Sequence, residues 1–542
     1  MEDEMKKVLF FVLTLSLLGG GLLFAAGGSA ASGSSAAGSV TSTPVGQYPV
    51  VADVTLRYWM ELDVNTSTNY TNLGETPFGR ELQKQTGIKV NFEHPAGAVA
   101  EAFNLMIASS GRDTPDIVMY SWMNYVGGPE KAIADGIVLR LNDSIDKWSP
   151  HFKSFFKANP EYDRLIKSDE GSYYVYPFIR DGEVLLYSAG LMIRKDWLDE
   201  LGLEPPQTIP DWYNVLVAFR DRKNITAPFT QTWGNRGSMF IPGFGILQGM
   251  HLDSQTGRVR YGQMQNGYRQ WIETMAQWYR EGLIDKDILT ITTAQQNQKM
   301  ISGGSGATYA SVGSGMGVWT DAARPGNPKY EILSMPYPVL NRGERLVYTI
   351  PGRIYQGSGS SAIMKESRNY ELAARFLDYG YTQPGIMLFN YGIEGESYTM
   401  VNGKPIYTPL VMSGGPNRWP LAQSLSAYIR ATTSMPYVQH EGYIRQYYAL
   451  PEQAQALINF VMPGAPSYLL PPTTPTQDES REYASIMQEI NTYVDEKTVR
   501  WLLGTDPIND ATWNDYVNNL RRMNIERAIA IQDLALDRFN KR

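Results

Sequence analysis

The sequence predicts an α/β fold of mostly parallel sheets with helices on both faces, because strand-like and helix-like segments alternate along the chain. Its 542 residues suffice for two or three domains at about 100–200 residues each. Hydrophobic residues make up 43% of the chain and charged residues 19%, so each domain can bury a core. This composition excludes a disordered or collagen-like chain.

Residues 1–26 have the pattern of a secretory signal peptide. Lys6 and Lys7 form a positive start, and small residues follow the apolar run Val8–Leu18. Cleavage would release an exported protein, whereas retention would leave a membrane anchor, since the apolar stretch with its glycines nearly reaches the roughly 20 residues of a span. The chain has no cysteine for lipid attachment, so we expect a periplasmic or cell-surface protein without that anchor. Residues 27–49, rich in Ser, Gly and Ala, predict a flexible tether.

The folded body opens with alternating strands and helices. Val54–Trp59 is a β-rich run. Thr76 and Pro77 then offer a side-chain cap and a first-turn proline for a helix that reaches Thr86 and ends at Gly87. The next elements in order are a strand at Ile88–Glu93, a helix at Val99–Ser110 and a buried strand at Asp116–Tyr120.

A second series continues the alternation. Thr208 and Asp211 cap a helix whose apolar side carries Trp212 and Phe219. Apolar periodicity also predicts helices in the C-terminal region between Ile486 and Leu536. The other segments are strand-like runs at Tyr173–Phe178 and Val184–Ile193, helices around Trp197–Leu201, Tyr268–Arg280 and Tyr370–Tyr379, and a Gly/Ser stretch at Gly357–Ser361.

Composition also limits the function. The chain has 48 Lys+Arg against 55 Asp+Glu, a formal net charge of -7, and no basic cluster, so we expect no nucleic-acid partner. Zero cysteines exclude disulfides, thiol catalysis, zinc-thiolate sites and iron–sulfur clusters. The 4 histidines are scattered, so no metal site and no cofactor are predicted.

Motifs for catalysis are missing from the sequence. Gly403-Lys404 precedes Pro405 and cannot open a phosphate-binding helix, and no nucleophile elbow or His pair at zinc-ligand spacing is present. Gly357–Ala362 imitates a dinucleotide fingerprint, but strand-like Ile363-Met364 follows it where a helix N-terminus is needed. We therefore predict no catalytic residue.

Aromatic residues offer the best candidates for binding. Trp122, Trp319, Trp233 and Trp419 lie at strand ends or among glycines rather than at core periodicity. Sugar rings stack on indole faces, and open α/β sheets bind ligands at the carboxyl ends of their strands. Core packing is the alternative for each of these residues, because tryptophan is highly buried on average.

Two acids flank Gly395 in a loop-like stretch. Glu394 and Glu396 are two residues apart, so in an extended segment they point to opposite sides and do not form an obvious catalytic pair. They are either acceptors for sugar hydroxyls or parts of a solvated turn.

Several stretches form a pattern that is specific in combination. They are Phe78–Val90 (FGRELQKQTGIKV), Ile193–Leu203 (IRKDWLDELGL), Glu281–Asp287 (EGLIDKD), Ala373–Gly380 (AARFLDYG) and Asn390–Thr399 (NYGIEGESYT). The chain after about Val50 resembles the extracellular solute-binding proteins of carbohydrate ABC importers (family 1), and most closely their large lipoprotein, LipO-like branch.

This resemblance implies a type II periplasmic-binding-protein-like fold. Two lobes, each a mostly parallel sheet flanked by helices, would be joined by crossing hinge strands. We expect residues 50–182 and 356–430 in lobe 1, and residues 183–355 and 431–542 in lobe 2. The resemblance also implies a monomer that binds a carbohydrate, an oligosaccharide, between its lobes and delivers it to the transmembrane subunits of an ABC permease.

The resemblance further implies where the hinge and the polar contacts lie. Crossings near Asp181–Tyr187 and near Arg353–Gly359 would form the hinge, and small residues in the second would absorb backbone rotation. Stacking is expected from Trp122 and Trp319, with Trp233 and Trp419 as further candidates. Polar contacts are expected from some of Arg180, Glu183, Arg353, Glu394 and Glu396.

Two departures from the family pattern change these expectations. Most relatives of this branch carry a lipobox cysteine, which is absent here. Some hold Ca²⁺ in a loop after the first helix of the second lobe, but the matching stretch Phe219–Pro228 (FRDRKNITAP) lacks the acidic ligand spacing, so no calcium is expected there.

Two other functions stay open: a secreted polysaccharide lyase or glycoside hydrolase, and a binding protein for peptides or another solute.

Overall fold

The computed structural model describes residues 43–109, 113–432, 435–461 and 467–542. The expected signal peptide at 1–26, and the expected tether up to residue 42, lie outside this part of the chain. The flexible tether expected up to residue 49 is wrong for residues 43–49. The buried guanidinium of Arg375 donates to the carbonyl oxygens of Thr43 at 2.9 Å and Pro44 at 2.8 Å, and the Tyr48 ring packs edge-on against Tyr379. The folded body therefore includes these residues.

A six-stranded sheet forms the core of lobe 1. Its order is β14-β4-β11-β3-β1-β2. All its strands except β11 run in one direction, because only the β11–β3 and β11–β4 pairs are antiparallel. The strands are β1 (Thr55–Trp59), β2 (Lys89–Glu93), β3 (Ile117–Met119), β4 (Tyr176–Asp181), β11 (Tyr355–Ile363) and β14 (Tyr437–His440).

A four-stranded sheet forms the core of lobe 2, in the order β10-β5-β9-β6. Here β5 alone runs against the other strands. The strands are β5 (Ala189–Arg194), β6 (Phe229–Thr230), β9 (Ala307–Ser311) and β10 (Ile332–Met335). The predicted two-lobe α/β fold is thus confirmed, and the sheet of lobe 1 is mostly parallel, whereas two of the three strand pairs in the sheet of lobe 2 are antiparallel because β5 lies between β10 and β9.

In each sheet the strand of opposite direction is the one that arrives from the other lobe. The chain leaves β4 at Asp181 and enters lobe 2 as β5, and it leaves β10 at Met335 and returns as β11. Both arriving strands have a partner on each side. Each of these two crossings therefore ends inside a sheet rather than at its edge, whereas the chain passes from lobe 1 to lobe 2 a third time between β14 and the C-terminal helices.

The expected lobe boundary at residue 430 falls before the last strand of the first sheet. β14 pairs in parallel with β4, and Tyr437 stacks on Phe178 with ring centroids 5.0 Å apart. Tyr437 and Val438 are fully buried. This pairing keeps the chain in lobe 1 as far as His440 and corrects the boundary.

Local signals start and stop the helices as expected. The Thr76 hydroxyl accepts from Gly79 N at 2.9 Å, and Gly87 ends that helix with a positive φ of 72°. Thr208 and Asp211 form the expected capping box. The helices of lobe 1 are α1 (Val64–Ser67), α2 (Pro77–Thr86), α3 (Val99–Ala108), α4 (Gly128–Ala134), α5 (Asn142–Trp148), α6 (Pro150–Ala158), α7 (Pro160–Ile166), α13 (Tyr370–Asp378), α14 (Gln383–Tyr391), α15 (Pro409–Met412), α16 (Leu421–Tyr428) and α17 (Glu441–Tyr447).

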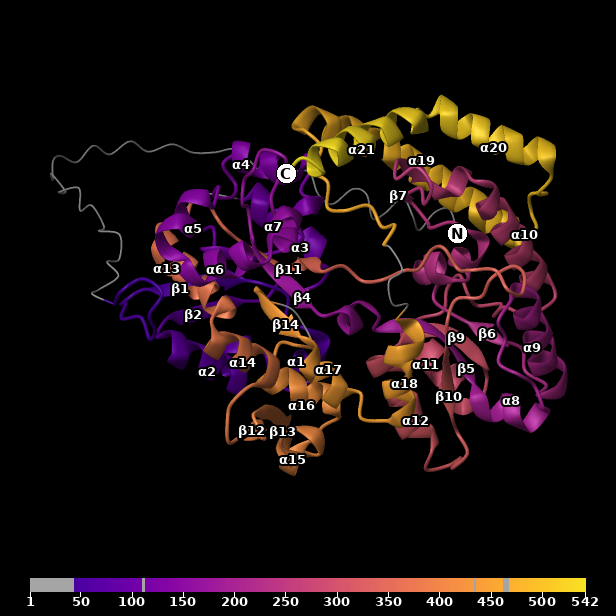
Figure 1. The fold of residues 1–542 in the computed structure, drawn as a ribbon, viewed down its shortest axis with the longest axis horizontal. Coiled ribbons are helices and arrows are strands. Elements are labelled where there is room, and N and C mark those ends of the chain that lie inside the picture. Colours follow the sequence, from indigo (N-terminus) through magenta and orange to yellow (C-terminus); the bar gives the residue numbers. More distant parts are fainter. Residues whose placement is uncertain (1–42, 110–112, 433–434, 462–466) are drawn as a thin grey trace, which may run out of the picture. The chain divides into compact units, whose positions relative to one another are not determined.

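The C-terminal helices lie beside the rest of lobe 2 in Figure 1, and their buried apolar residues belong to its core. Two small hairpins, β7 (Met250–Leu252) with β8 (Val259–Tyr261) and β12 (Tyr398–Val401) with β13 (Lys404–Tyr407), lie outside the main sheets. The remaining helices are α8 (Lys195–Leu201), α9 (Ile209–Arg222), α10 (Asn266–Arg280), α11 (Thr293–Ser302), α12 (Val318–Ala323), α18 (Pro451–Phe460), α19 (Gln477–Leu503), α20 (Asp510–Arg522) and α21 (Ile525–Phe539).

Candidate functional site

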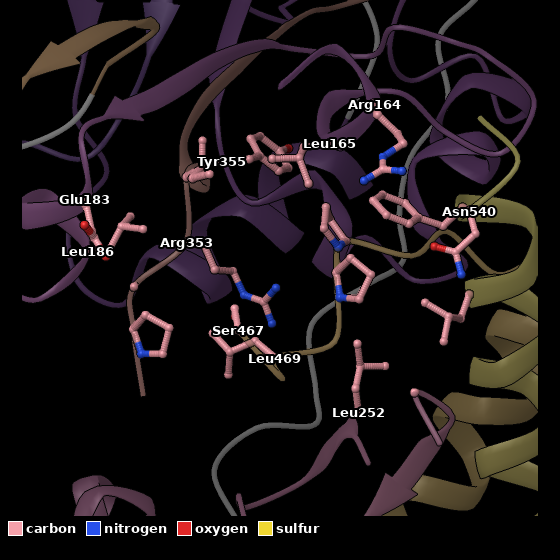
Figure 2. A pocket seen from close by; sticks show the side chains of 18 of the residues that line it. Arg164, Leu165, Glu183, Leu186, Leu252, Arg353, Tyr355, Ser467, Leu469 and Asn540 are labelled. Atoms are coloured by element: carbon pink, nitrogen blue, oxygen red, sulfur yellow. The ribbon is translucent and has the colours of Figure 1, made fainter. Parts of the chain in front are cut away.

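A cavity of about 460 Å³ lies where the chain crosses between the two sheets (Figure 2). We call it the crossing cavity. Its walls come from the two crossing segments, from α7 of lobe 1, from the C-terminal end of α21, from β7, and from the segment 467–472 that precedes α19. Residues far apart in the sequence, and from both lobes, therefore meet around one space.

The first crossing contributes Glu183, Leu186 and Tyr187 to the wall. The residue before this short turn is Gly182, with a φ of 149°, a conformation that L-residues with a side chain rarely adopt. Glu183 is exposed and Tyr187 is buried. The turn thus presents one exposed carboxylate and one aromatic ring.

The second crossing contributes residues Pro351 to Tyr355. The two crossings are hydrogen-bonded to each other, because Gly352 N donates to Leu186 O at 2.6 Å and Arg180 N donates to Ile354 O at 2.9 Å. A side chain at Gly352 would meet the Arg180 guanidinium, since a Cβ placed there lies 3.0 Å from Nη1. Position 352 therefore requires glycine, because the Arg180 guanidinium approaches its backbone too closely for a side chain.

Arg353 extends into the middle of the cavity in Figure 2. Its Nη1 donates to Leu470 O at 2.7 Å. The side chain is open to solvent, yet protein surrounds it on several sides, and this partial desolvation lowers the pKa of Arg353 from its ordinary value. A guanidinium stays charged in proteins, so Arg353 brings a positive charge to the site.

Tyr355 forms part of the floor next to lobe 1. Its hydroxyl lies 3.2 Å from the hydroxyl of Tyr174, which in turn donates to Met123 Sδ at 3.2 Å. Burial raises the pKa of Tyr355, so its hydroxyl stays neutral. The ring is buried on the protein side and lines the cavity.

The wall opposite Arg353 is built by α7 and α21. The Arg164 guanidinium lies over the Phe539 ring, 5.0 Å from its centroid. Asp169 anchors α21 to lobe 1, because this buried carboxylate accepts from Arg538 Nε at 2.7 Å and from Arg542 Nε at 3.0 Å. This anchor holds the C-terminal helix against the cavity.

β7 supports the lobe 2 wall. Leu252 N donates to Tyr468 O at 2.8 Å, which joins the hairpin to the segment before α19. The neighbouring His251 is fully buried and donates from Nδ1 to Gly249 O at 3.1 Å. Burial lowers the pKa of His251 to about 4, so the ring is neutral at pH 7.

Three of the sequence candidates meet at this site. Glu183 and Arg353 line the cavity, and Arg180 lies directly behind Gly352. Glu183 lies in the first expected crossing, and Arg180 lies just before it in β4. The second crossing runs from residue 336 to 354, so of the expected segment only Arg353 and Ile354 belong to it, and the Gly/Ser stretch expected to absorb rotation lies inside β11.

Trp122 and Trp319 do not line the crossing cavity. Trp122 is 1% exposed, donates from Nε1 to Val118 O at 3.3 Å, and packs edge-on against Phe103. Trp319 is 0% exposed and donates from Nε1 to Asn297 Oδ1 at 2.8 Å. In this structure core packing explains both residues, so we remove them from the candidate binding surface.

The remaining candidates lie apart from the crossing cavity. Trp233 is half-buried in lobe 2 under the Arg236 guanidinium, and Trp419 is half-buried against Tyr70 in lobe 1. Glu394 and Glu396 are exposed in the turn before β12. The structure does not bring these residues to the crossings, and their role in binding stays a prediction.

Sequence reasoning missed Arg164, Tyr187, Tyr355 and Phe539. Arg164 and Phe539 lie on helices, where their spacing indicates only an amphipathic face. Tyr187 and Tyr355 lie next to candidates that were singled out, so the expected crossings were the one signal that could have found them.

No group of three or more His, Asp or Glu residues is placed to hold a metal ion in the described part of the chain. In the stretch Phe219–Pro228, residues 219–222 belong to α9, and Lys223 pairs with Glu200 at 2.8 Å. No helix within the described ranges is long and apolar enough to span a membrane.

Comparison with known proteins assigns the family. Residues 70–386, more than half of the chain, match the bacterial extracellular solute-binding proteins. The chain belongs to this family. Its members are binding proteins rather than enzymes, and solved structures of relatives share the two-lobe fold.

Individual relatives cover most of the solute-binding protein's length. The fructooligosaccharide ABC transporter substrate-binding protein FusA of Streptococcus pneumoniae is 25% identical over 486 residues, covering 85% of this chain and 86% of that protein. The polygalacturonan/rhamnogalacturonan-binding protein YtcQ of Bacillus subtilis is 24% identical over 331 residues, covering 59% of this chain and 63% of that protein. The crystal structure of the alginate-binding protein AlgQ2 without calcium ion has a TM-score of 0.73 and 26% identity, covering 89% of this chain and 98% of that chain.

Proposed function

We propose that this solute-binding protein captures an oligosaccharide in the crossing cavity and delivers it to the membrane subunits of an ABC importer. The observation that carries the proposal is the cavity itself, which residues from both lobes and both crossings line. Relatives named for fructooligosaccharide, polygalacturonan and alginate binding support a carbohydrate ligand. The rings of Tyr187 and Tyr355 line the cavity as apolar surface for sugar faces, and the arginines offer donors for sugar oxygens.

Transport requires that the ligand shift the equilibrium between the open and closed arrangements of the two lobes. A ligand that touches both lobes binds more tightly when the lobes close around it, and this difference shifts the equilibrium toward the closed form. The crossings at residues 181–189 and 336–354 are the segments that would rotate. Each segment contains a glycine at a position that does not accommodate a side chain: Gly182 because of its positive φ, and Gly352 because Arg180 lies too close.

Export follows from the same proposal. A solute-binding protein acts outside the membrane, and residues 1–26 supply the expected signal peptide. We infer that the exported protein acts as a monomer.

Thermal-shift screening of a glycan library against a peptide library tests the proposal. We expect oligosaccharides to raise the melting temperature and peptides to leave it unchanged. Stabilisation by peptides alone would refute a carbohydrate ligand. New reducing ends after incubation with the stabilising glycan would instead show an enzyme.

A further inference from the structure

The charged side chains around the crossing cavity are mainly positive. Arg164 and Arg353 line it together with one carboxylate, that of Glu183, so two positive charges and one negative charge give a net charge of +1. The whole chain has a formal net charge of -7. The cavity wall is therefore opposite in sign to the protein as a whole.

The two guanidinium groups keep free donors. Neither Arg164 nor Arg353 has a carboxylate within ion-pair distance among the described residues, and the contact of Arg353 with Leu470 O uses only one of its five N–H groups. Arg164 lies over Phe539, which holds the group in place without occupying its hydrogens. In Figure 2 the two side chains extend into the cavity from different walls, and Glu183 lies at one edge beside Leu186.

Arg180 adds a third positive charge behind the wall. Its Nη1 is close to Gly352, its Nε is buried without a hydrogen-bond partner, and no carboxylate pairs with it in the described part of the chain. The hydroxyls of Tyr437, Tyr443 and Tyr448 lie close enough to interact with its charge. A partly desolvated cation without an anion is unfavourable, and a bound anion would offset that cost.

We propose that the oligosaccharide bound in the crossing cavity carries carboxylate groups, as hexuronic acid residues do, and that Arg353 and Arg164 bind them. The planar fork of a guanidinium fits a carboxylate through two parallel hydrogen bonds. This inference rests on the proposed function and narrows its ligand from saccharides in general to acidic ones. A neutral oligosaccharide would leave the charges of the wall uncompensated.

Isothermal titration of the purified protein with three trisaccharides tests the inference. Trigalacturonic acid carries the carboxylates, its methyl ester keeps the same skeleton without the charges, and kestose is neutral. We expect the acid to bind at least about tenfold more tightly than the ester, because charge-assisted hydrogen bonds are lost in the ester. Its affinity should also fall as salt rises from about 50 mM to about 500 mM, since screening weakens attraction between charges.

Variants locate the effect. Arg353→Gln and Arg164→Gln should each weaken acid binding about 10- to 100-fold, and Arg353→Lys should weaken it less. Arg222→Gln makes the same change of charge on an exposed residue of α9 and should leave affinity unchanged. Melting curves of all variants show whether each one is folded.

The outcomes separate the inference from the proposed function. If the ester or kestose binds as tightly as the acid, or if Arg353→Gln binds the acid like the wild type, the acidic ligand is refuted while oligosaccharide binding stands. If no saccharide of the wider glycan library binds, both proposals are refuted. Salt-sensitive binding of the acid that Arg353→Gln abolishes supports both.

Discussion

The two sides of the crossing segments are built differently. On one side lies the crossing cavity, whose walls carry arginines and backbone carbonyl groups and which the Asp169 anchor helps to hold. On the other side an apolar cluster, which includes Leu185, Val312, Ile429 and Leu457, joins residues of both lobes. One side of the junction thus relies on ion pairs and hydrogen bonds, and the other relies on packing.

One junction can both bind a ligand and move because its two sides depend on different kinds of contact. Apolar contacts are non-directional and tolerate small sliding movements, whereas hydrogen bonds and ion pairs depend on distance and angle. We expect the apolar side to keep the lobes together in every arrangement, while contacts at the cavity side change with the ligand. Three substitutions test this comparison.

The largest effect is expected on the cavity side, from Asp169→Ala. The carboxylate is 8% exposed and pairs with both Arg538 and Arg542, so its removal leaves the largely buried charge of Arg542 without an anion. Loss of one partner of a buried pair costs about 3–5 kcal/mol. Urea denaturation should show a clearly lower midpoint, whereas Asp478→Ala, at an ion pair whose aspartate is 95% exposed, should match the wild type. Equal midpoints for the two variants would show that the anchor contributes nothing.

The apolar side is probed by Leu457→Ala with Ile458→Ala as its control. Leu457 is 5% exposed in the cluster, and its neighbour Ile458 is 67% exposed. We expect Leu457→Ala to lower the free energy of unfolding by about 2–5 kcal/mol and Ile458→Ala to change it little. Ligand affinity of Leu457→Ala, measured where the protein is folded, should stay close to the wild-type value. A loss of affinity as large as that of an arginine variant would contradict the separation of the two sides.

The smallest effect concerns pH and His251. Burial lowers the pKa of this histidine from 6.5 to about 4, so protonation favours the unfolded chain. Stability from the neutral ring is present above pH 6.5 and is lost as the pH falls toward 4, by about 2 kcal/mol at pH 5. His251→Asn should lose this part of the pH dependence, and His440→Asn on the other side of the crossings should retain it. If the melting temperatures of the wild type and His251→Asn fall by the same amount between pH 8 and pH 5, the assignment to His251 is refuted.

Prediction from the sequence succeeded where a local signal was enough. Thr76, Gly87 and the pair Thr208–Asp211 act at the helix ends as their spacing indicated. The crossings were found because the family resemblance supplies their order, and this brought Arg180, Glu183 and Arg353 into the candidate site.

It failed where the outcome depends on tertiary packing. Trp122 and Trp319 follow strands or glycines, a pattern that fits a ligand-binding ring as well as a core ring. In the structure both rings are buried in the core, Trp122 against Phe103 and Trp319 hydrogen-bonded to Asn297. Arg164 and Phe539 meet only after α21 has folded back onto α7, a contact between residues 375 positions apart that no local pattern signals.

The placement of β11 inside the first sheet has a consequence for biosynthesis. Lobe 1 has β1, β2, β3 and β4 early in the chain, but the strand that joins β3 to β4 comes only with residues 355–363. The ribosome will have produced the whole sheet of lobe 2 before that strand emerges. We therefore expect the sheet of lobe 2 to form during translation, before the sheet of lobe 1 is complete. Until β11 is synthesised, the early strands of lobe 1 stay unpaired on one side and accessible to chaperones.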